Sequence, residues 1–253
     1  MDASSDLTLS ELKEFLDQKA TLYEQPNFIQ EDPICLAHRF SQKEDIEIVA
    51  FLVSTISWGK RSSIIKSGER LLDILGPEPL AYVLNYKDGA YPTFIHRTFN
   101  QVDLNGFLLG LKHCYENGGL EAAFEAKTPK VYDRIMHFRE IFTPFLQARS
   151  QKHVANPNSG SAAKRLIMFL RWMSRPAVKG VDFGIWPQHH LPYLMIPLDV
   201  HTGNISRKLG LLKRSQNDWK ANEELYEQCV ALDPTDPAKY DFALFGLGVY
   251  ENF

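Results

Sequence analysis

Lys164 and Asp199 are the two residues whose type and local sequence suit nucleophilic chemistry. Lys164 follows a stretch of small and turn-forming residues and lies near the start of a helix predicted over 161–174, which Ser161 would cap. A helix N-terminus disfavours an ammonium group, typically by a few tenths to about 1 kcal/mol, and so helps to supply the neutral amine that a nucleophilic lysine needs. The alternative interpretation is an ordinary lysine on an exposed basic helix face.

Asp199 is predicted to begin a second helix. The segment Leu194–Leu212 is apolar up to this aspartate, and Gly210 suits the left-handed position just past a helix end. Asp is a favoured N-cap because its carboxylate accepts the free N–H groups of the first turn. One interpretation is therefore a capped amphipathic helix, and the other is a carboxylate that accepts a proton or stabilises positive charge.

Helical periodicity predicts that the elements positioning these residues are all α-helical. Alternating strand patterns are nearly absent, and Gly or Pro stands at the ends of helical segments. Ile46–Trp58 is almost entirely apolar and is predicted to be a buried core helix, whereas 174–198 is predicted to be a long structured loop. Helices are expected over 8–24, 33–40, 46–58, 62–75, 79–85, 103–117, 119–126, 131–147, 161–174, 199–210, 218–230 and 237–247.

Composition indicates an ordinary globular protein. The chain has 253 residues, of which 44% are hydrophobic and 12% aromatic. The central apolar run, Ile48–Gly59, is shorter than the about 20 residues that span a membrane. The polar N-terminus, Met1–Asp6, does not resemble a secretory signal. We therefore expect a cytoplasmic protein without a membrane segment.

Cysteine and histidine usage predicts neither a disulfide framework nor a metal site. The three cysteines are far apart in the sequence, which suits a reducing compartment. His189 and His190 are adjacent, so they would point apart in regular structure. No metal and no cofactor is expected.

Charge is distributed unevenly along the chain. The net charge is −3, but the segment from Lys127 to Lys179 has eleven Lys and Arg residues against two acidic residues. Such a segment is compatible with a surface that faces phosphates, and equally with a solvated helix face.

The sequence around Asp199 resembles that of the helix-hairpin-helix (HhH-GPD) DNA glycosylases. Leu198–His201 followed by Arg207–Leu211 is similar to the Val-Asp-Thr-His…Arg-Arg-Leu-Gly-Leu stretch of that superfamily, in which the aspartate is catalytic. Pro157–Gly160 is similar to a reduced form of the hairpin that precedes the nucleophilic lysine. The nearest resemblance is to the archaeal 8-oxoguanine glycosylase branch, and it also implies an uncharacterised conserved bacterial family related to that branch.

The resemblance covers about 46–75 and 152–250, and it implies a fold and a set of site residues. The fold would be a single all-α domain over 1–253, with two helical lobes around a cleft and with the hairpin and catalytic segment at about 152–212. The implied catalytic residues are Lys164 and Asp199. The implied base pocket comprises Met168, Asp241 and Phe245. The implied DNA-binding residues are Lys152, Ser159, Gly160, Ser161, Arg165, Arg171, Arg175 and His201.

Some positions depart from the superfamily pattern. Lys164 follows Gly160 by four residues, where the common spacing is two. Ile56 stands near the position at which many members use Gln, and Asn204 stands where many have Arg. The cysteines that bind an iron–sulfur cluster in many relatives are absent from the sequence.

Three functions follow as hypotheses. The first is a bifunctional DNA glycosylase and abasic-site lyase that acts on damaged duplex DNA through a Schiff base at Lys164, with an oxidised purine as the favoured lesion. The second is a nucleic-acid-binding or damage-recognition module that keeps the fold without catalysis. The third is a helical interaction protein with no nucleic-acid role, against which the basic segment argues.

Overall fold

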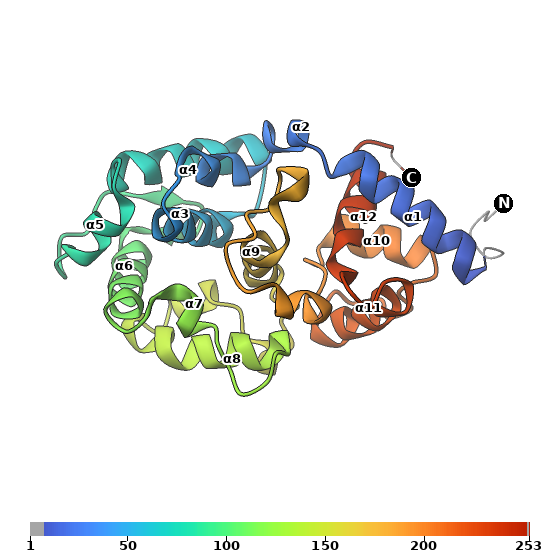
Figure 1. The fold of residues 1–253 in the computed structure, drawn as a ribbon. Coiled ribbons are helices and arrows are strands. Elements are labelled where there is room, and N and C mark those ends of the chain that lie inside the picture. The colour runs from blue at the N-terminus through green and yellow to red at the C-terminus, as the bar shows by residue number, and fades with distance from the viewer. Residues whose placement is uncertain (1–7, 252) are drawn as a thin grey trace. The chain divides into compact units, whose positions relative to one another are not determined.

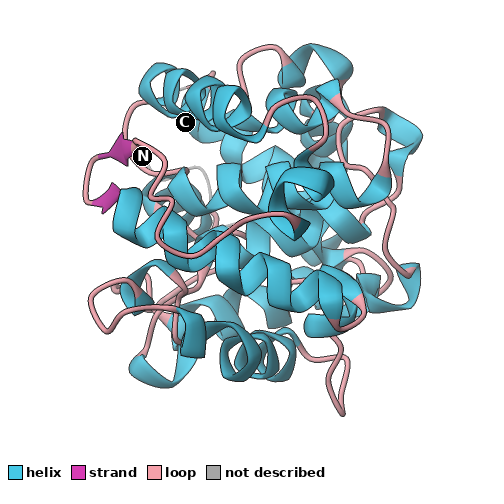
Figure 2. Ribbon diagram, turned by 90° about the vertical axis from the view of Figure 1, so that its left-hand side faces the viewer, coloured by secondary structure: helices cyan, strands magenta, loops and turns pink. Residues whose placement is uncertain are grey.

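Helices make up most of the structure, a computed structural model that describes residues 8–251 and 253 (Figure 1). Among these residues, two short antiparallel strands, β1 (Ile95–His96) and β2 (Phe99–Asn100), form a small sheet (Figure 2). Ile95 pairs with Asn100, and His96 pairs with Phe99. The prediction of an all-α protein is therefore confirmed, with a two-stranded hairpin added to it.

Apart from α2 (Pro26–Ile29), which the sequence did not predict, each α-helix overlaps a predicted segment. They are α1 (Leu9–Tyr23), α2 (Pro26–Ile29), α3 (Lys43–Ile56), α4 (Arg61–Leu75), α5 (Pro79–Leu84), α6 (Gln101–Glu116), α7 (Gly119–Ala123), α8 (Val131–Phe142), α9 (Lys164–Ser174), α10 (Val200–Lys208), α11 (Trp219–Leu232) and α12 (Tyr240–Val249). Short 3-10 helices lie between them: η1 (Pro33–Arg39), η2 (Thr143–Phe145), η3 (Gln151–His153), η4 (Pro157–Ser159), η5 (Ala177–Lys179), η6 (Gln188–Tyr193) and η7 (Pro237–Lys239).

Local sequence chemistry explains where several of these helices begin. Thr8 and Glu11 form a capping box at the start of α1, in which each side chain bonds the other residue's backbone N–H. Asp32 caps the next predicted helix by accepting a hydrogen bond from the Ile34 N–H. That segment is the 3-10 helix η1 and not the predicted α-helix. The cap therefore determines where the helix begins but not whether it is an α-helix or a 3-10 helix.

The described chain divides into two compact units. The first unit comprises the described residues up to Phe28 together with Pro157–Phe253, and the second comprises Ile29–Asn156. In the second unit, α3 is buried along almost its whole length, as its apolar sequence predicts, and Phe51 packs on the rings of Phe107 and Phe142. No α-helix in the described part of the chain combines the length and apolarity needed to cross a membrane. The N-terminal segment Met1–Asp6 lies outside the described residues.

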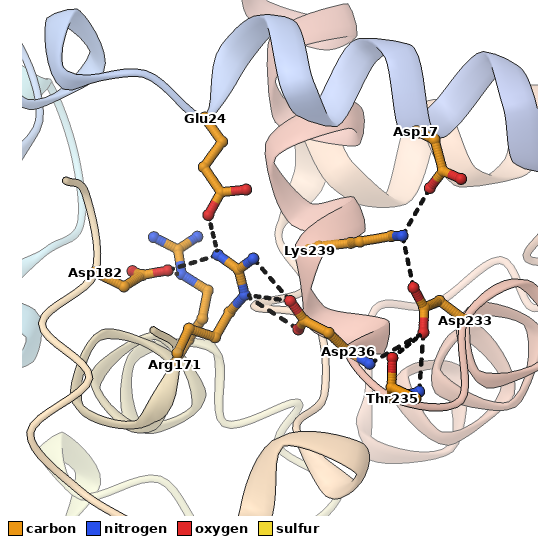
Figure 3. A network of polar contacts seen from close by, with 9 residues as sticks. Asp17, Glu24, Arg171, Asp182, Asp233, Thr235, Asp236 and Lys239 are labelled. Atoms are coloured by element: carbon orange, nitrogen blue, oxygen red, sulfur yellow. Dashed lines mark hydrogen bonds and ion pairs between the residues drawn. The ribbon is translucent and has the colours of Figure 1, made fainter. Parts of the chain in front are cut away.

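The first unit holds both Lys164 and Asp199, and its core joins the N-terminal helix to the C-terminal ones. Helix α1 lies against α12 (Figure 1). Apolar side chains from α1, α10, α11 and α12 form one buried cluster. An ion-pair bridge adds to this packing, because Lys239 contacts Asp17 of α1 at 2.8 Å and Asp233 at 2.6 Å (Figure 3).

Candidate catalytic site at the starts of α9 and α10

Lys164 is the first residue of α9. The N-cap is Ala163, whose backbone is left-handed with a φ of 52°, and it makes no side-chain cap. Ser161 forms an isolated β-bridge with Asp218, and its hydroxyl accepts a hydrogen bond from the Ala163 N–H at 3.2 Å. The prediction that Ser161 caps the helix was therefore wrong, because the chain turns sharply at Ala163. Lys164 nevertheless lies in the first turn, as expected.

Asp199 is the N-cap of α10, which confirms the sequence prediction. Its Oδ1 accepts a hydrogen bond from the Thr202 N–H at 3.0 Å, and its backbone carbonyl accepts one from the Gly203 N–H at 2.9 Å. The helix ends at Lys208, and Gly210 follows with a positive φ of 74°. Because Oδ1 serves the cap, the second carboxylate oxygen is directed elsewhere.

That second oxygen lies beside the lysine. The distance from Lys164 Nζ to Asp199 Oδ2 is 4.0 Å, and the two side chains are 30% and 31% exposed. The Lys164 amine also lies 3.6 Å from the thioether sulfur of Met168, one helical turn further along α9. The structure thus brings an amine and a carboxylate together at two helix starts, with access to solvent.

Asp241 lies close to this pair but is buried. Burial raises its pKa to about 6, the nearby Arg171 guanidinium and Lys164 amine act to lower it, and the Asp199 charge acts to raise it. Its Oδ2 accepts a hydrogen bond from Arg171 Nη1. Phe245, one turn further along α12, packs edge-on against Phe28 with their ring centroids 5.7 Å apart. Asp241 is thus engaged by a protein cation and only 7% exposed.

Arg171 and Arg175, which the sequence placed on a DNA-binding helix face, are buried. Arg171 Nε donates to Asp182 Oδ1 at 3.3 Å (Figure 3). Arg175 Nη1 donates to Asp182 Oδ2 at 2.8 Å and to Glu24 Oε1 at 2.7 Å. Arg175 also contacts Asp236 at 2.8 Å. Both guanidinium groups are therefore committed to carboxylates in this structure.

The helix-face prediction for these arginines was wrong for a physical reason. The pattern of apolar residues left one face of α9 polar, but α9 is buried from Leu166 to Ser174. Carboxylates from other segments neutralise the arginines on that face, and Asp182 is central because it contacts both of them. Asp182 is the single acidic residue of the loop 174–198, and it is the sequence feature that could have revealed this network.

The other predicted DNA-binding residues have mixed accessibility. Ser159, Gly160 and His201 are exposed, and Ser161 is partly exposed. Arg165 is partly buried, and this burial lowers its pKa to about 10. Lys152 is exposed on η3 of the second unit.

Comparison with known proteins assigns the chain to a family. Residues 32–250 match the family described as "Protein of unknown function (DUF2400)". The chain belongs to the DUF2400 family. No curated protein and no solved structure matches it. Membership of an uncharacterised family is what the sequence led us to expect.

In this DUF2400 protein the geometry at Lys164 and Asp199 suits amine chemistry. A carboxylate 4.0 Å from an amine can accept a proton from it directly after a small side-chain movement, or through one water. Met168 supplies an apolar wall beside the amine, and Asp241 adds a second carboxylate whose protonation changes near pH 6. The DUF2400 match spans both units.

Proposed function

We propose that this protein is a DNA glycosylase with abasic-site lyase activity, which uses Lys164 as a nucleophile. The observation that carries the proposal is the Lys164–Asp199 pair at the starts of α9 and α10, with 4.0 Å between amine and carboxylate. Both groups keep access to solvent, which an attack on an external substrate requires. The resemblance of the flanking sequences to helix-hairpin-helix glycosylases supports the same assignment.

The proposed reaction begins with a neutral Lys164 amine. Asp199 accepts the proton that the amine gives up, and the amine forms a bond to the sugar carbon C1′ as the bond to the base breaks. The base leaves with that electron pair and takes up a proton. Opening of the sugar ring gives a Schiff base, from which elimination cleaves the strand. An extruded nucleotide is the substrate, because C1′ is not accessible within a stacked duplex.

The DNA partner is supported by the hairpin and by the basic segment. Ser159 and Gly160 are exposed just before the start of α9, and the N–H groups of a helix's first turn suit a phosphate. Arg171 and Arg175 are left out of this proposed contact, because both pair with buried carboxylates. An oxidised purine remains the favoured lesion, on the resemblance alone.

A second candidate function is a recognition module without catalysis, and one observation favours it. Asp241, the residue proposed to bond the extruded base, already accepts a hydrogen bond from Arg171 and is buried. A base would have to compete with that guanidinium. Phe245 packs against Phe28, so an extruded base that stacks on Phe245 would also compete with an existing contact.

Borohydride trapping on duplex DNA with an abasic site tests the proposal. Reduction of the Schiff base should lock the wild-type protein covalently onto the DNA. Lys164→Gln should form no adduct yet bind the duplex, whereas Asp199→Asn should bind and react slowly, because Asn keeps the cap but not the charge. Good binding without any adduct would favour the recognition module. An adduct that persists in Lys164→Gln would assign the nucleophile to another amine.

A further inference from the structure

The segment from Asn217 to Asn222, which leads into α11, contacts both loops that carry Lys164 and Asp199. We call it the clamp segment. The Trp219 N–H donates to the Gly160 carbonyl at 3.0 Å, and Asp218 forms a β-bridge with Ser161. These two contacts hold the hairpin that precedes Lys164.

Asn222 joins the two loops through a single side-chain amide. Its Nδ2 donates to the Ile196 carbonyl at 3.0 Å and to the Ala162 carbonyl at 3.3 Å, and the residue is fully buried. Both partners are acceptors, so they determine which way the amide points. Ala162 lies two residues before Lys164, and Ile196 lies three residues before Asp199. The Asn222 amide thus links the backbone that leads to Lys164 with the backbone that leads to Asp199.

Asn217 holds Asp199 itself. Its Nδ2 donates to the Asp199 carbonyl at 2.8 Å, and its Oδ1 accepts a hydrogen bond from Arg207 Nη2 at 2.6 Å. A side chain at Gly203 would enter this contact, because a Cβ there would lie 2.5 Å from Asn217 Oδ1. The amide therefore fits only because residue 203 has no side chain.

We infer that the clamp segment sets the distance between the Lys164 amine and the Asp199 carboxylate, which makes Asn217 and Asn222 positioning residues. The inference rests on the proposed function, since it assigns these residues to the Schiff-base reaction. The clamp binds each loop at a backbone carbonyl that lies within three residues of Lys164 or Asp199. Loosening the clamp therefore displaces one loop relative to the other. A misplacement of about 1 Å can cost about 100-fold in rate.

The test uses two variants that disturb the clamp and one that does not. Asn217→Asp keeps the acceptor for Arg207 but replaces the donor to the Asp199 carbonyl by an oxygen. Gly203→Ala displaces the Asn217 side chain. This variant should still fold, because Ala favours a helix over Gly by about 1 kcal/mol. Lys220→Ala is the matched control, because Lys220 is an exposed residue within the clamp segment and makes none of the contacts described above.

The first measurement is the rate of borohydride-trapped adduct on abasic-site duplex from mildly acidic to alkaline pH. Both clamp variants should react about 10-fold or more slowly, with a displaced pH profile, while melting temperature and duplex affinity stay close to wild type. A merely structural role would lower the melting temperature and leave the pH profile in place. Clamp variants that match the wild type in rate and profile would overturn the inference and leave the proposed function standing.

A second measurement separates failure of the inference from failure of the proposed function. Reductive methylation with formaldehyde and cyanoborohydride, followed by peptide mass spectrometry, reports how readily Lys164 reacts at each pH, with the exposed Lys179 as internal reference. If the wild type forms no adduct, the proposed function fails, and the labelling then tests the clamp inference by itself. A Lys164 profile displaced in both clamp variants but not in Lys220→Ala supports the clamp, and identical profiles overturn it.

Discussion

Asp199 and Asp241 lie near the same amine but in different surroundings. Asp199 caps α10 with one oxygen, faces Lys164 with the other and is about one-third exposed. Asp241 is buried and pairs with Arg171, and its burial raises its pKa to about 6. Two carboxylates in unlike environments can serve unlike roles. We expect Asp241 to change its charge near pH 6.

Asp241→Asn should change how stability depends on pH. The folded-state pKa of Asp241 lies above its ordinary value, so the wild type loses free energy of unfolding as the pH rises through about 4 to 6. Asn has no such proton, and Arg171 retains Asp182 as a partner. The stability difference should therefore move in favour of the variant by up to about 3 kcal/mol between low and neutral pH.

Urea unfolding at a series of pH values measures this difference. Asp73→Asn, an exposed carboxylate of α4 in the other unit, is the control and should leave the curve parallel to the wild type. Parallel curves for Asp241→Asn as well would mean that Asp241 does not titrate in this range.

The sequence could predict Lys164 and Asp199 because caps and helix starts depend on neighbouring residues. Asp199 caps α10 as the Asp-led segment indicates, and Lys164 begins α9 even though Ser161 does not cap it. The environment of Arg175 could not be predicted in this way. One of its partners, Glu24, lies 151 residues away in the sequence, and no local pattern specifies such a contact.

At the level of elements, α1 and α12 pack at close range through a glycine. A Cβ at Gly246 would overlap the ring of Tyr23. That ring has little freedom to move, because its hydroxyl donates to Glu251 and its face stacks on Tyr250 with ring centroids 5.5 Å apart. The bare backbone at Gly246 therefore allows the two helices to approach.

Gly246→Ala should destabilise the protein despite the better helix propensity of alanine. Propensity alone would add up to about 1 kcal/mol, whereas overpacking costs about 1–3 kcal/mol. Thermal unfolding should show a lower melting temperature. In a Tyr23→Ala background the same substitution should become neutral or stabilising, because the overlapping ring is gone. A loss that is equal in both backgrounds would contradict this account of the packing.

Over the whole molecule, the sequence predicts the helices better than it predicts their grouping. Every predicted helical segment contains a helix, because periodicity and turn residues are local. The grouping of α1 with α9–α12 in one unit depends on long-range packing of α1 on α12, and the predicted single domain with two lobes did not specify which helices group together. Within the predicted loop 174–198 the structure contains two 3-10 helices, η5 and η6, which the sequence did not predict.

The basic segment, Lys127–Lys179, has residues in both units. Of its eleven Lys and Arg residues, Arg134, Arg171 and Arg175 are buried and unsuited to phosphate contacts. Lys152 is exposed and remains a candidate. The structure therefore predicts weaker salt dependence of duplex binding than the sequence count suggests.

Each phosphate contact contributes about −0.9 to the slope of log affinity against log salt concentration. Lys152→Ala should therefore reduce the magnitude of the slope by about 0.9 if this lysine contacts DNA. Lys220→Ala, exposed on α11 outside the basic segment, should leave it unchanged. Fluorescence anisotropy of a labelled duplex between low and moderate salt measures the slope for both variants.

An equal change in the two variants would indicate a general charge effect, because the net charge of −3 already opposes binding to DNA. Undetectable or salt-independent binding of the wild type would remove both nucleic-acid functions and leave the helical interaction protein.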